Sequence, residues 1–191
     1  LKGYDAVVHL AARVGVGQSM DEPFDYALTN VLETAHLVKQ MAKAGVPRLV
    51  IASSMSVYGE GSRDHGVPED WPRNPRSVYA TTKNAAEEIA MQLADYHGIE
   101  AVALRYFNIY GPRQTLSNPY TGLGAIFTRQ IREGTRPTVF EDGQQLRDFI
   151  HVSDVARATV AALDAPPGEV YNIGTGVPTN VYDFANLLCE A

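Results

Sequence analysis

Short uninterrupted runs of apolar residues alternate with longer segments of helical periodicity over the first part of the chain. Polar residues, Gly or Pro bound each run, and its length is that of a strand buried on both faces. We expect three such strands, at Asp5–Ala12, Arg48–Ser53 and Glu100–Tyr106.

The segments between these runs have the spacing of amphipathic helices. One helix is expected over about Tyr26–Ala44 and another over about Tyr79–His97, each followed by a glycine that ends it, Gly45 and Gly98. Residues 59–77 are rich in Gly, Pro and charge and predict an exposed loop. Apolar strands alternating with helices predict an α/β fold, a Rossmann-like doubly wound parallel sheet with helices on both faces.

The pattern changes after residue 110, where prolines divide the chain into shorter elements. We therefore divide it into residues 1–110, the main part of the sheet, and residues 111–191, a smaller C-terminal portion interleaved with the last sheet strands. In an open α/β sheet, ligands lie at the carboxyl ends of the strands, so the smaller portion is expected to bind substrate. The elements expected there are strands near Thr138–Phe140, Phe149–Val152 and Glu169–Ile173, and helices near Gly124–Glu133, Ser153–Leu163 and from about Asn180.

Composition narrows the class of protein. The 191 residues are 45% hydrophobic and carry a formal charge of −6, and this acidic balance argues against a nucleic-acid partner. No run of about 18 apolar residues is present, so we expect no membrane span. The single cysteine, Cys189, and the lack of a signal peptide indicate a reduced, cytoplasmic setting. Because the chain does not begin with Met, we expect a fragment.

Two groups of titratable residues are expected to be structural. The histidines lack metal-ligand spacing, so no metal is predicted; they are His9, His36, His65, His97 and His151. The adjacent acids Glu87 and Glu88 are expected on a solvated helix face.

A phenol and an ammonium lie four residues apart at the start of the second long helix. At that spacing Tyr79 and Lys83 share one helix face. A neighbouring cation lowers the pKa of a tyrosine, and a shift from about 10 to about 7 requires roughly 4 kcal/mol. The pair is therefore a candidate acid/base centre, although a surface Tyr–Lys pair has the same spacing.

Two serines, Ser53 and Ser54, follow the second apolar run. The end of such a strand presents hydroxyl groups to a ligand of the sheet. A turn that uses serines for local hydrogen bonds is the alternative.

Seven motifs occur in an order that resembles one family. They are HLAA (His9–Ala12), Asn30, SSMSVYG (Ser53–Gly59), YATTK (Tyr79–Lys83), RYFNIYGPRQ (Arg105–Gln114), RDFIHVSDVA (Arg147–Ala156) and YNIGTG (Tyr171–Gly176). The chain resembles the extended short-chain dehydrogenase/reductases, in particular the NAD-dependent nucleotide-sugar epimerase/dehydratase branch, over nearly its whole length.

The resemblance implies a function for individual residues. Ser54 would hydrogen-bond the sugar, Tyr79 would act as acid and base, and Lys83 would bind the nicotinamide ribose and tune Tyr79. The residues implied for the NAD site are Ala11, Ala12, Asn30, Ser53, Tyr79, Lys83 and Tyr106. Those implied to contact a nucleotide-diphosphate sugar are Ser54, Tyr79, Asn108, Phe140 and Arg147.

Some of these assignments have structural alternatives. Arg147 suits a phosphate because a guanidinium binds such oxygens bidentately, yet it could instead pair with Asp148 or Asp154. Phe140 could belong to the nucleotide-base pocket or to the core. The family usually forms homodimers through the YxxxK helix and the helix before it, which would partly bury Val31, Leu32, Ile89 and Leu93.

Two departures from the family pattern refine the prediction. The glycine-rich turn that seats the NAD pyrophosphate is missing, so we expect an N-terminally truncated chain and a partial NAD-binding domain in residues 1–110. Related dehydratases carry an acid where Met55 and Ser56 stand, and water elimination needs that acid. We therefore expect a 4-epimerase.

The substrate is left open between a UDP-hexose and a dTDP-6-deoxyhexose, the second suggested by the tract Thr115–Gly122. A reductase or dehydratase of the same superfamily, and a non-catalytic nucleotide-binding homologue or fragment, are the alternatives.

Overall fold

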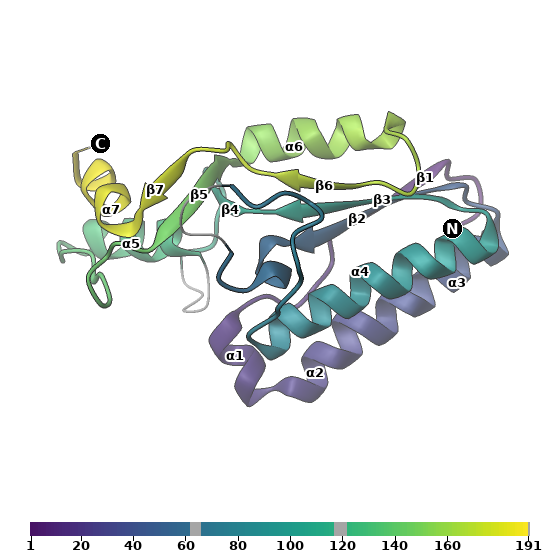
Figure 1. Cartoon of the computed structure of the whole chain (residues 1–191), viewed down its shortest axis with the longest axis horizontal. Coiled ribbons are helices and arrows are strands. Elements are labelled where there is room, and N and C mark those ends of the chain that lie inside the picture. The colour runs from purple at the N-terminus through teal and green to yellow at the C-terminus, as the bar shows by residue number, and fades with distance from the viewer. Residues whose placement is uncertain (62–65, 117–121, 191) are drawn as a thin grey trace.

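A four-stranded parallel sheet forms the centre of the fold in the computed structural model, which describes residues 1–61, 66–116 and 122–190. Its strands are β1 (Ala6–His9), β2 (Arg48–Ser54), β3 (Glu100–Tyr106) and β6 (Val170–Ile173), in the order β1-β2-β3-β6. Helices α3 (Glu33–Ala44) and α4 (Val78–His97) cover one face, and α6 (Val152–Ala161) covers the other (Figure 1). The expected Rossmann-like α/β architecture is confirmed.

The two faces of the sheet have separate apolar cores. On one face, Val38 and Met41 of α3 and Ala90 of α4 pack with Leu49 and Ile51 of β2. On the other, residues of β2 and β3 pack against the turn Ala162–Asp164 that follows α6. The strands β2 and β3 are therefore buried on both faces, as their unbroken apolar runs predicted.

The first strand differs from its prediction. It is half as long as expected, and Val8 is 38% exposed. Among the described residues, β1 pairs only with β2 and so lies at one edge of the sheet. The positions after His9 leave the ladder and form a loop at the carboxyl end of the strand.

The first helical segment is broken into pieces. Two short helices, α1 (Val16–Asp21) and α2 (Pro23–Ala27), precede α3, and a π-helical turn, Leu28–Leu32, joins α2 to α3. The helix begins at Pro23 instead of Tyr26 because proline is well suited to the first helical position.

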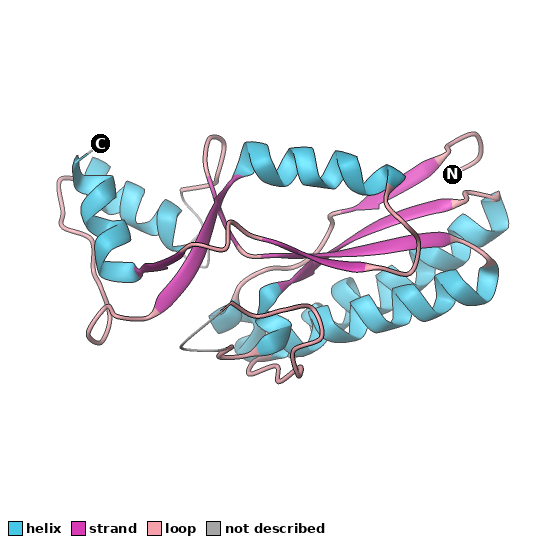
Figure 2. Ribbon diagram, turned by 45° about the horizontal axis from the view of Figure 1, so that its top comes forward, coloured by secondary structure: helices cyan, strands magenta, loops and turns pink. Residues whose placement is uncertain are grey.

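A second, three-stranded sheet lies beyond the carboxyl ends of the first (Figure 2). Its strands are β4 (Asn108–Tyr110), β5 (Leu146–His151) and β7 (Pro178–Asn180), with β4 and β5 parallel and β7 antiparallel. Helices α5 (Leu123–Arg132) and α7 (Val181–Glu190) pack on it through a cluster that includes Phe127 and Phe184, with Phe149 stacked on Phe184.

The strand expected at Thr138–Phe140 is not formed. The backbone N–H of Thr138 donates to the side chain of Gln130 instead of to a neighbouring strand. The prediction of a strand at this position is therefore wrong, because among the described residues no strand pairs with it.

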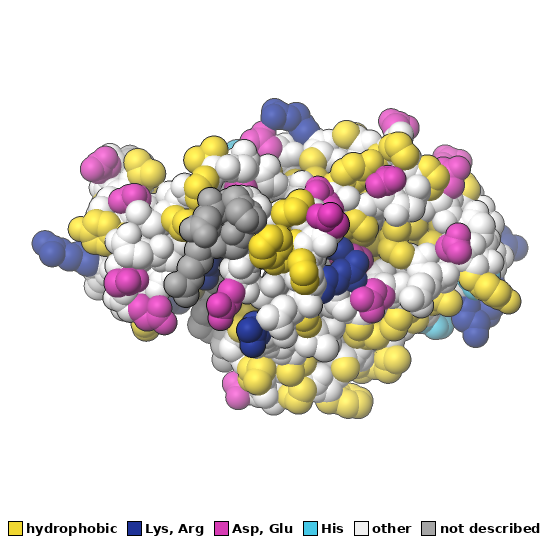
Figure 3. All heavy atoms as spheres, in the orientation of Figure 1, with side chains coloured by type: hydrophobic (Ala, Val, Ile, Leu, Met, Phe, Trp, Pro, Cys, Tyr) yellow, Lys and Arg dark blue, Asp and Glu magenta, His cyan; other side chains and the backbone are white. Residues whose placement is uncertain are grey.

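Two surface properties bear on possible partners. None of the described helices has both the length and the apolar character needed to cross a membrane. Acidic and basic side chains are interspersed on the face seen in Figure 3, with no continuous basic stripe.

Candidate active site

The carboxyl ends of the parallel strands bring the predicted catalytic residues to one edge of the main sheet. Ser53 and Ser54 end β2 and lie opposite Arg105 and Tyr106 of β3 in the parallel register. A 3-10 turn, Met55–Tyr58, follows at once and bends the chain away from the sheet. The helix that carries Tyr79, α4, begins near this edge. In a parallel sheet the connecting helix runs back along the strands, so it starts at their carboxyl ends.

Ser54 is the N-cap of the 3-10 turn. Its hydroxyl oxygen accepts a hydrogen bond from the backbone N–H of Ser56 at 3.2 Å. The same hydroxyl interacts with the phenol of Tyr79. The structure therefore unites Ser54 and Tyr79, and the turn-forming role considered as an alternative for the serine is present as well.

Tyr79 is held at the first turn of α4 by two other serines. Ser77 caps the helix by accepting from the N–H of Ala80 at 3.1 Å. Buried Ser19 of α1 accepts from the N–H of Tyr79 at 3.0 Å. Because both bonds satisfy free helix N–H groups, they fix the backbone from which the phenol projects.

The pKa of Tyr79 is raised above its usual value by burial, and the hydrogen bond from Ser54 only partly opposes this. Lys83 is not among the groups that act on this pKa, and the lowering expected from Lys83 together with a bound nicotinamide cation stays a prediction. The Lys83 ammonium donates to the backbone oxygen of Ala52 at 2.7 Å. At neutral pH the phenol is therefore protonated.

Lys83 is itself strongly desolvated. Its side chain is 6% exposed, and burial lowers its pKa to about 8, with the negative charge of Glu87 acting in the opposite direction. An ammonium in this environment is poised near neutrality and can respond to charge brought next to it.

Glu87 does not lie on a solvated face, contrary to the sequence-based expectation. It is 1% exposed and forms a two-pronged ion pair with Arg105, Nε to Oε2 at 3.1 Å and Nη2 to Oε1 at 2.7 Å. Its helical spacing could have indicated this, because Glu87 follows Lys83 by four residues and so shares its face. Only Glu88, at the next position, is exposed.

The loop after β1 carries two residues predicted for the cofactor site. Ala11 is exposed and Ala12 half-buried, at the edge where the strands end. Asn30, in the π-helical turn, is 1% exposed and holds this loop: it bonds both the N–H and the C=O of Arg13, at 2.8 and 3.1 Å, and donates to Thr82 of α4 at 3.1 Å. Asn30 therefore ties the loop to the catalytic helix.

Tyr106 lies beside Ser54 in the register, yet its hydroxyl bonds to Thr159 of α6 at 2.7 Å. Burial raises the pKa of Tyr106, so this phenol remains neutral. The side chain of Tyr106 thus joins the end of β3 to α6.

Two residues predicted to contact substrate lie together in the second sheet. Asn108 of β4 donates to the backbone oxygen of Asp148 at 3.2 Å, next to Arg147 of β5. The acids considered as partners of Arg147 have other partners: Asp148 accepts from Thr175, and Asp154 pairs with Arg157.

Phe140 lies on the loop before β5 and is 75% exposed, so the alternative of a core side chain is wrong. Other positions lie outside the described residues, namely His65 and residues 117–121 of the Thr115–Gly122 tract. Elsewhere in the chain, no group of three or more His, Cys, Asp or Glu residues is arranged to hold a metal ion.

Residues 1–174 match the family described as the NAD dependent epimerase/dehydratase family. The chain belongs to this family. The resemblance inferred from the seven motifs is thereby confirmed, and members of the family are NAD-dependent nucleotide-sugar enzymes.

Individual relatives are similar over nearly all of the chain. A putative UDP-glucose 4-epimerase of Methanocaldococcus jannaschii is 37% identical over 98% of the chain and 61% of its own length. A dTDP-L-rhamnose 4-epimerase of Burkholderia thailandensis is 34% identical over 96% of the chain and 60% of its own length. The chain thus spans about 60% of these relatives.

Solved structures include both reaction types of the family. UDP-glucose 4-epimerase of Thermotoga maritima with UDP-glucose superposes with a TM-score of 0.92 at 36% identity, over 97% of this chain and 60% of that one. A dTDP-glucose 4,6-dehydratase of Streptomyces venezuelae with NAD bound gives 0.88 at 30% identity, over 99% and 57%. Overall likeness therefore leaves the choice between epimerisation and dehydration to the residues of the site.

Proposed function

We propose that the protein containing this chain is an NAD-dependent nucleotide-sugar 4-epimerase. The observation that carries the proposal is the grouping of Ser54, Tyr79 and Lys83 at the end of β2, with Met55 and Ser56 in the adjoining turn. Hydride transfer at a sugar carbon needs a proton acceptor, a positioned hydroxyl and a cation near the acceptor. Elimination of water needs a further acid, and neither Met55 nor Ser56 is suited to that role.

The site also offers polar groups that suit a cofactor and a sugar. The Lys83 ammonium is buried at the sheet edge where the loop of Ala11 and Ala12 lies. The Ser56 hydroxyl is buried and has no hydrogen-bond partner among the described residues. We propose that Lys83 reaches the nicotinamide ribose and that a sugar hydroxyl can bond Ser56.

In the proposed mechanism, Tyr79 removes the proton of the sugar 4-hydroxyl while Ser54 holds that hydroxyl in place. When bound, NAD supplies the hydride acceptor and later the hydride donor at C4. The sugar thus passes through a 4-keto form, turns about its diphosphate linkage, and is reduced on its other face. Tyr79 then returns the proton, so the net reaction is an isomerisation.

The raised pKa of Tyr79 sets a requirement on this mechanism. Burial opposes formation of a phenolate, so the proton can leave only when positive charge lies beside the phenol. Lys83 and the positively charged nicotinamide ring would supply that charge. Deprotonation would thereby be coupled to occupation of the cofactor site.

We propose that residues 1–110 form the cofactor side of the site and residues 111–191 most of the substrate side. Ala11, Ala12, Asn30, Ser53 and Tyr106 would form the cofactor side with Tyr79 and Lys83. Asn108 and Arg147 would face the diphosphate, because a guanidinium and an amide can both donate to phosphate oxygens. The exposed ring of Phe140 would stack on the nucleotide base.

The test is Tyr79→Phe in the full-length protein, assayed with a panel of UDP-hexoses and dTDP-6-deoxyhexoses. Loss of the phenolic proton carrier should lower kcat by about 10² to 10⁴ while the melting temperature is unchanged. Full activity of Tyr79→Phe contradicts the assignment. A product lighter by one water would instead identify a dehydratase, and net consumption of NAD(P)H a reductase.

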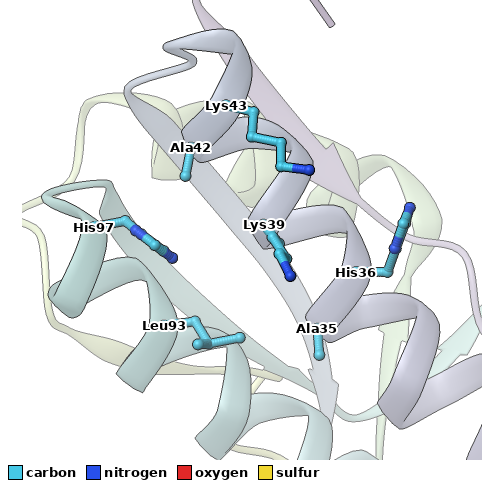
Figure 4. Close-up of a pocket in the computed structure, with 7 residues that line it drawn as sticks. All are labelled: Ala35, His36, Lys39, Ala42, Lys43, Leu93 and His97. Atoms are coloured by element: carbon cyan, nitrogen blue, oxygen red, sulfur yellow. The ribbon is translucent and has the colours of Figure 1, made fainter.

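We also propose that the protein forms a homodimer through the outer face of α3 and α4. Leu32 is 60% exposed, and a groove lined by Ala35, His36, Lys39, Ala42, Lys43, Leu93 and His97 runs between the two helices (Figure 4). Val31, Ile89 and Leu93 lie half-buried on these helices. Leu32→Glu should shift the sedimentation coefficient from dimer to monomer; a monomeric wild type contradicts this proposal.

A further inference from the structure

A buried ion pair joins Glu87, one helical turn after Lys83 on α4, to Arg105 on β3. Glu87 and Arg105 are each 1% exposed, and the carboxylate receives two bonds from the guanidinium. Buried ion pairs of this kind are poor stabilisers compared with apolar side chains of the same volume, because desolvation of both charges offsets their attraction. Their presence at this position therefore needs another explanation.

The carboxylate of Glu87 connects the pair to the end of β2. The hydroxyl of Ser53 donates to Glu87 Oε2. Ser53 directly precedes Ser54 in β2. Since Glu87 lies on α4, this bond joins the strand that ends in Ser54 to the helix that begins with Tyr79. The bond thus links the two elements that carry the hydroxyls of Ser54 and Tyr79.

The guanidinium of Arg105 holds the turn that follows Ser54. Its Nη1 donates to the hydroxyl of Tyr58 at 2.6 Å and to the backbone oxygen of Glu69 at 2.8 Å. Tyr58 ends the 3-10 turn and in turn donates to Asn172 of β6 at 2.7 Å. Ser54 is therefore constrained from both sides, through Ser53 before it and the turn after it.

Glu87 also acts on Lys83 through its charge. The groups that act on Lys83 or lie beside it are Glu87 and Tyr79 of α4 and His9 of β1. His9 is neutral at pH 7, since burial lowers its pKa and the charge of Lys83 lowers it further. Glu87 is thus the anion that favours the ammonium form of Lys83. Burial raises the pKa of Glu87, but its bonds to Arg105 and Ser53 and the charges of Arg105 and Arg73 together hold that pKa low.

We propose that Glu87 and Arg105 are positioning residues that fix Ser54 against Tyr79 and keep Lys83 in its ammonium form. This inference rests on the proposed function for its catalytic consequences. It assigns no direct contact with substrate to either residue.

The first test compares Glu87→Gln with Glu88→Gln, which removes the charge of the neighbouring exposed carboxylate. Arg73 pairs with both acids, and in Glu88→Gln it keeps its contact with Glu87. In the full-length enzyme, Glu87→Gln should lower kcat at least about tenfold, as expected for small displacements of reacting groups, with KM changed little. As the pH is raised, kcat of Glu87→Gln should also be lost at a lower pH than kcat of the wild type. The reason is that the pKa of Lys83, about 8 in the wild type, drops when the charge of Glu87 is removed. Glu88→Gln should leave both unchanged.

A purely structural role predicts a different pattern. Glu87→Gln would then lower the amount of folded enzyme and its melting temperature, but the folded fraction would keep the kcat and pH profile of the wild type. That result overturns the inference. If the single variant does not fold, Glu87→Gln combined with Arg105→Met removes both charges, and the same two patterns apply to it.

A second test does not depend on the proposed reaction. The rate of acetylation of Lys83 by acetic anhydride, measured by mass spectrometry against pH and normalised to exposed Lys2, reports the pKa of Lys83 in the folded protein. A lower pKa in Glu87→Gln than in Glu88→Gln supports the inference even if the wild type fails to epimerise any nucleotide sugar. Equal values in both variants contradict the charge effect of Glu87.

Discussion

Replacing Lys83 by methionine should stabilise the protein at neutral pH while abolishing its activity. The Lys83 side chain is 6% exposed, and its pKa lies at about 8 instead of the usual 10.5. This difference corresponds to about 3 kcal/mol by which burial penalises the ammonium. Methionine has a similar length and no charge to desolvate. Subtracting about 1 kcal/mol for the lost bond to Ala52 leaves a net gain of about 2 kcal/mol.

The pH dependence follows from the same two values. Between pH 8 and 10.5 the unfolded wild type holds a proton on Lys83 that the folded protein has released, so wild-type stability rises with pH. From pH 7 to 9.5 this rise amounts to about 2 kcal/mol, and Lys83→Met lacks it. The advantage of the variant should therefore nearly vanish at pH 9.5.

Urea unfolding at pH 7 and pH 9.5 measures both effects, with Lys2→Met, at an exposed position before β1, as the control. The control should change the free energy of unfolding by less than about 0.5 kcal/mol at either pH. A Lys83→Met protein that is less stable than wild type at pH 7, or a difference independent of pH, refutes the argument that Lys83 is held against a desolvation penalty.

Three further substitutions test other parts of the account. Asn30→Ala leaves the part-buried backbone N–H and C=O of Arg13 without their bonds to Asn30, so urea unfolding should show a loss of about 2 kcal/mol, together with weaker NAD binding by calorimetry in the full-length protein. Phe140→Ala, at a side chain 75% exposed, should leave the free energy of unfolding within about 0.5 kcal/mol but raise KM for the nucleotide sugar. Gly59 has φ 73° and a side chain there would collide with the backbone oxygen of Asn74, so Gly59→Ala should lower the melting temperature more than Gly45→Ala, where φ is 70° but space is open.

Periodicity predicted the central elements well because burial determines their pattern. β3 was predicted to the residue, and α4 within one residue of its start, since Ser77 caps the helix and Gly98 ends it in a left-handed conformation. These signals are local: a cap, a glycine and an unbroken apolar run are visible without knowledge of the rest of the fold.

The features that the sequence did not predict depend on contacts between distant segments. β1 reads as a buried strand, but its exposure is set by its place at the edge of the sheet. Glu87 reads as a surface acid, but Arg105, on a strand 18 positions later, makes it a buried one. The sequence places Lys83 four residues after Tyr79, but it shows neither the burial that raises the pKa of Tyr79 nor the bond from Lys83 to Ala52.

The central claim is that this site interconverts C4 epimers of a nucleotide sugar. The most direct measurement incubates the full-length protein and NAD with a UDP-hexose or a dTDP-6-deoxyhexose and follows the C4 configuration by proton NMR. We predict an equilibrium mixture of the two epimers, of unchanged mass and with no net formation of NADH. A product that has lost water, or stoichiometric reduction of NAD, would contradict the claim.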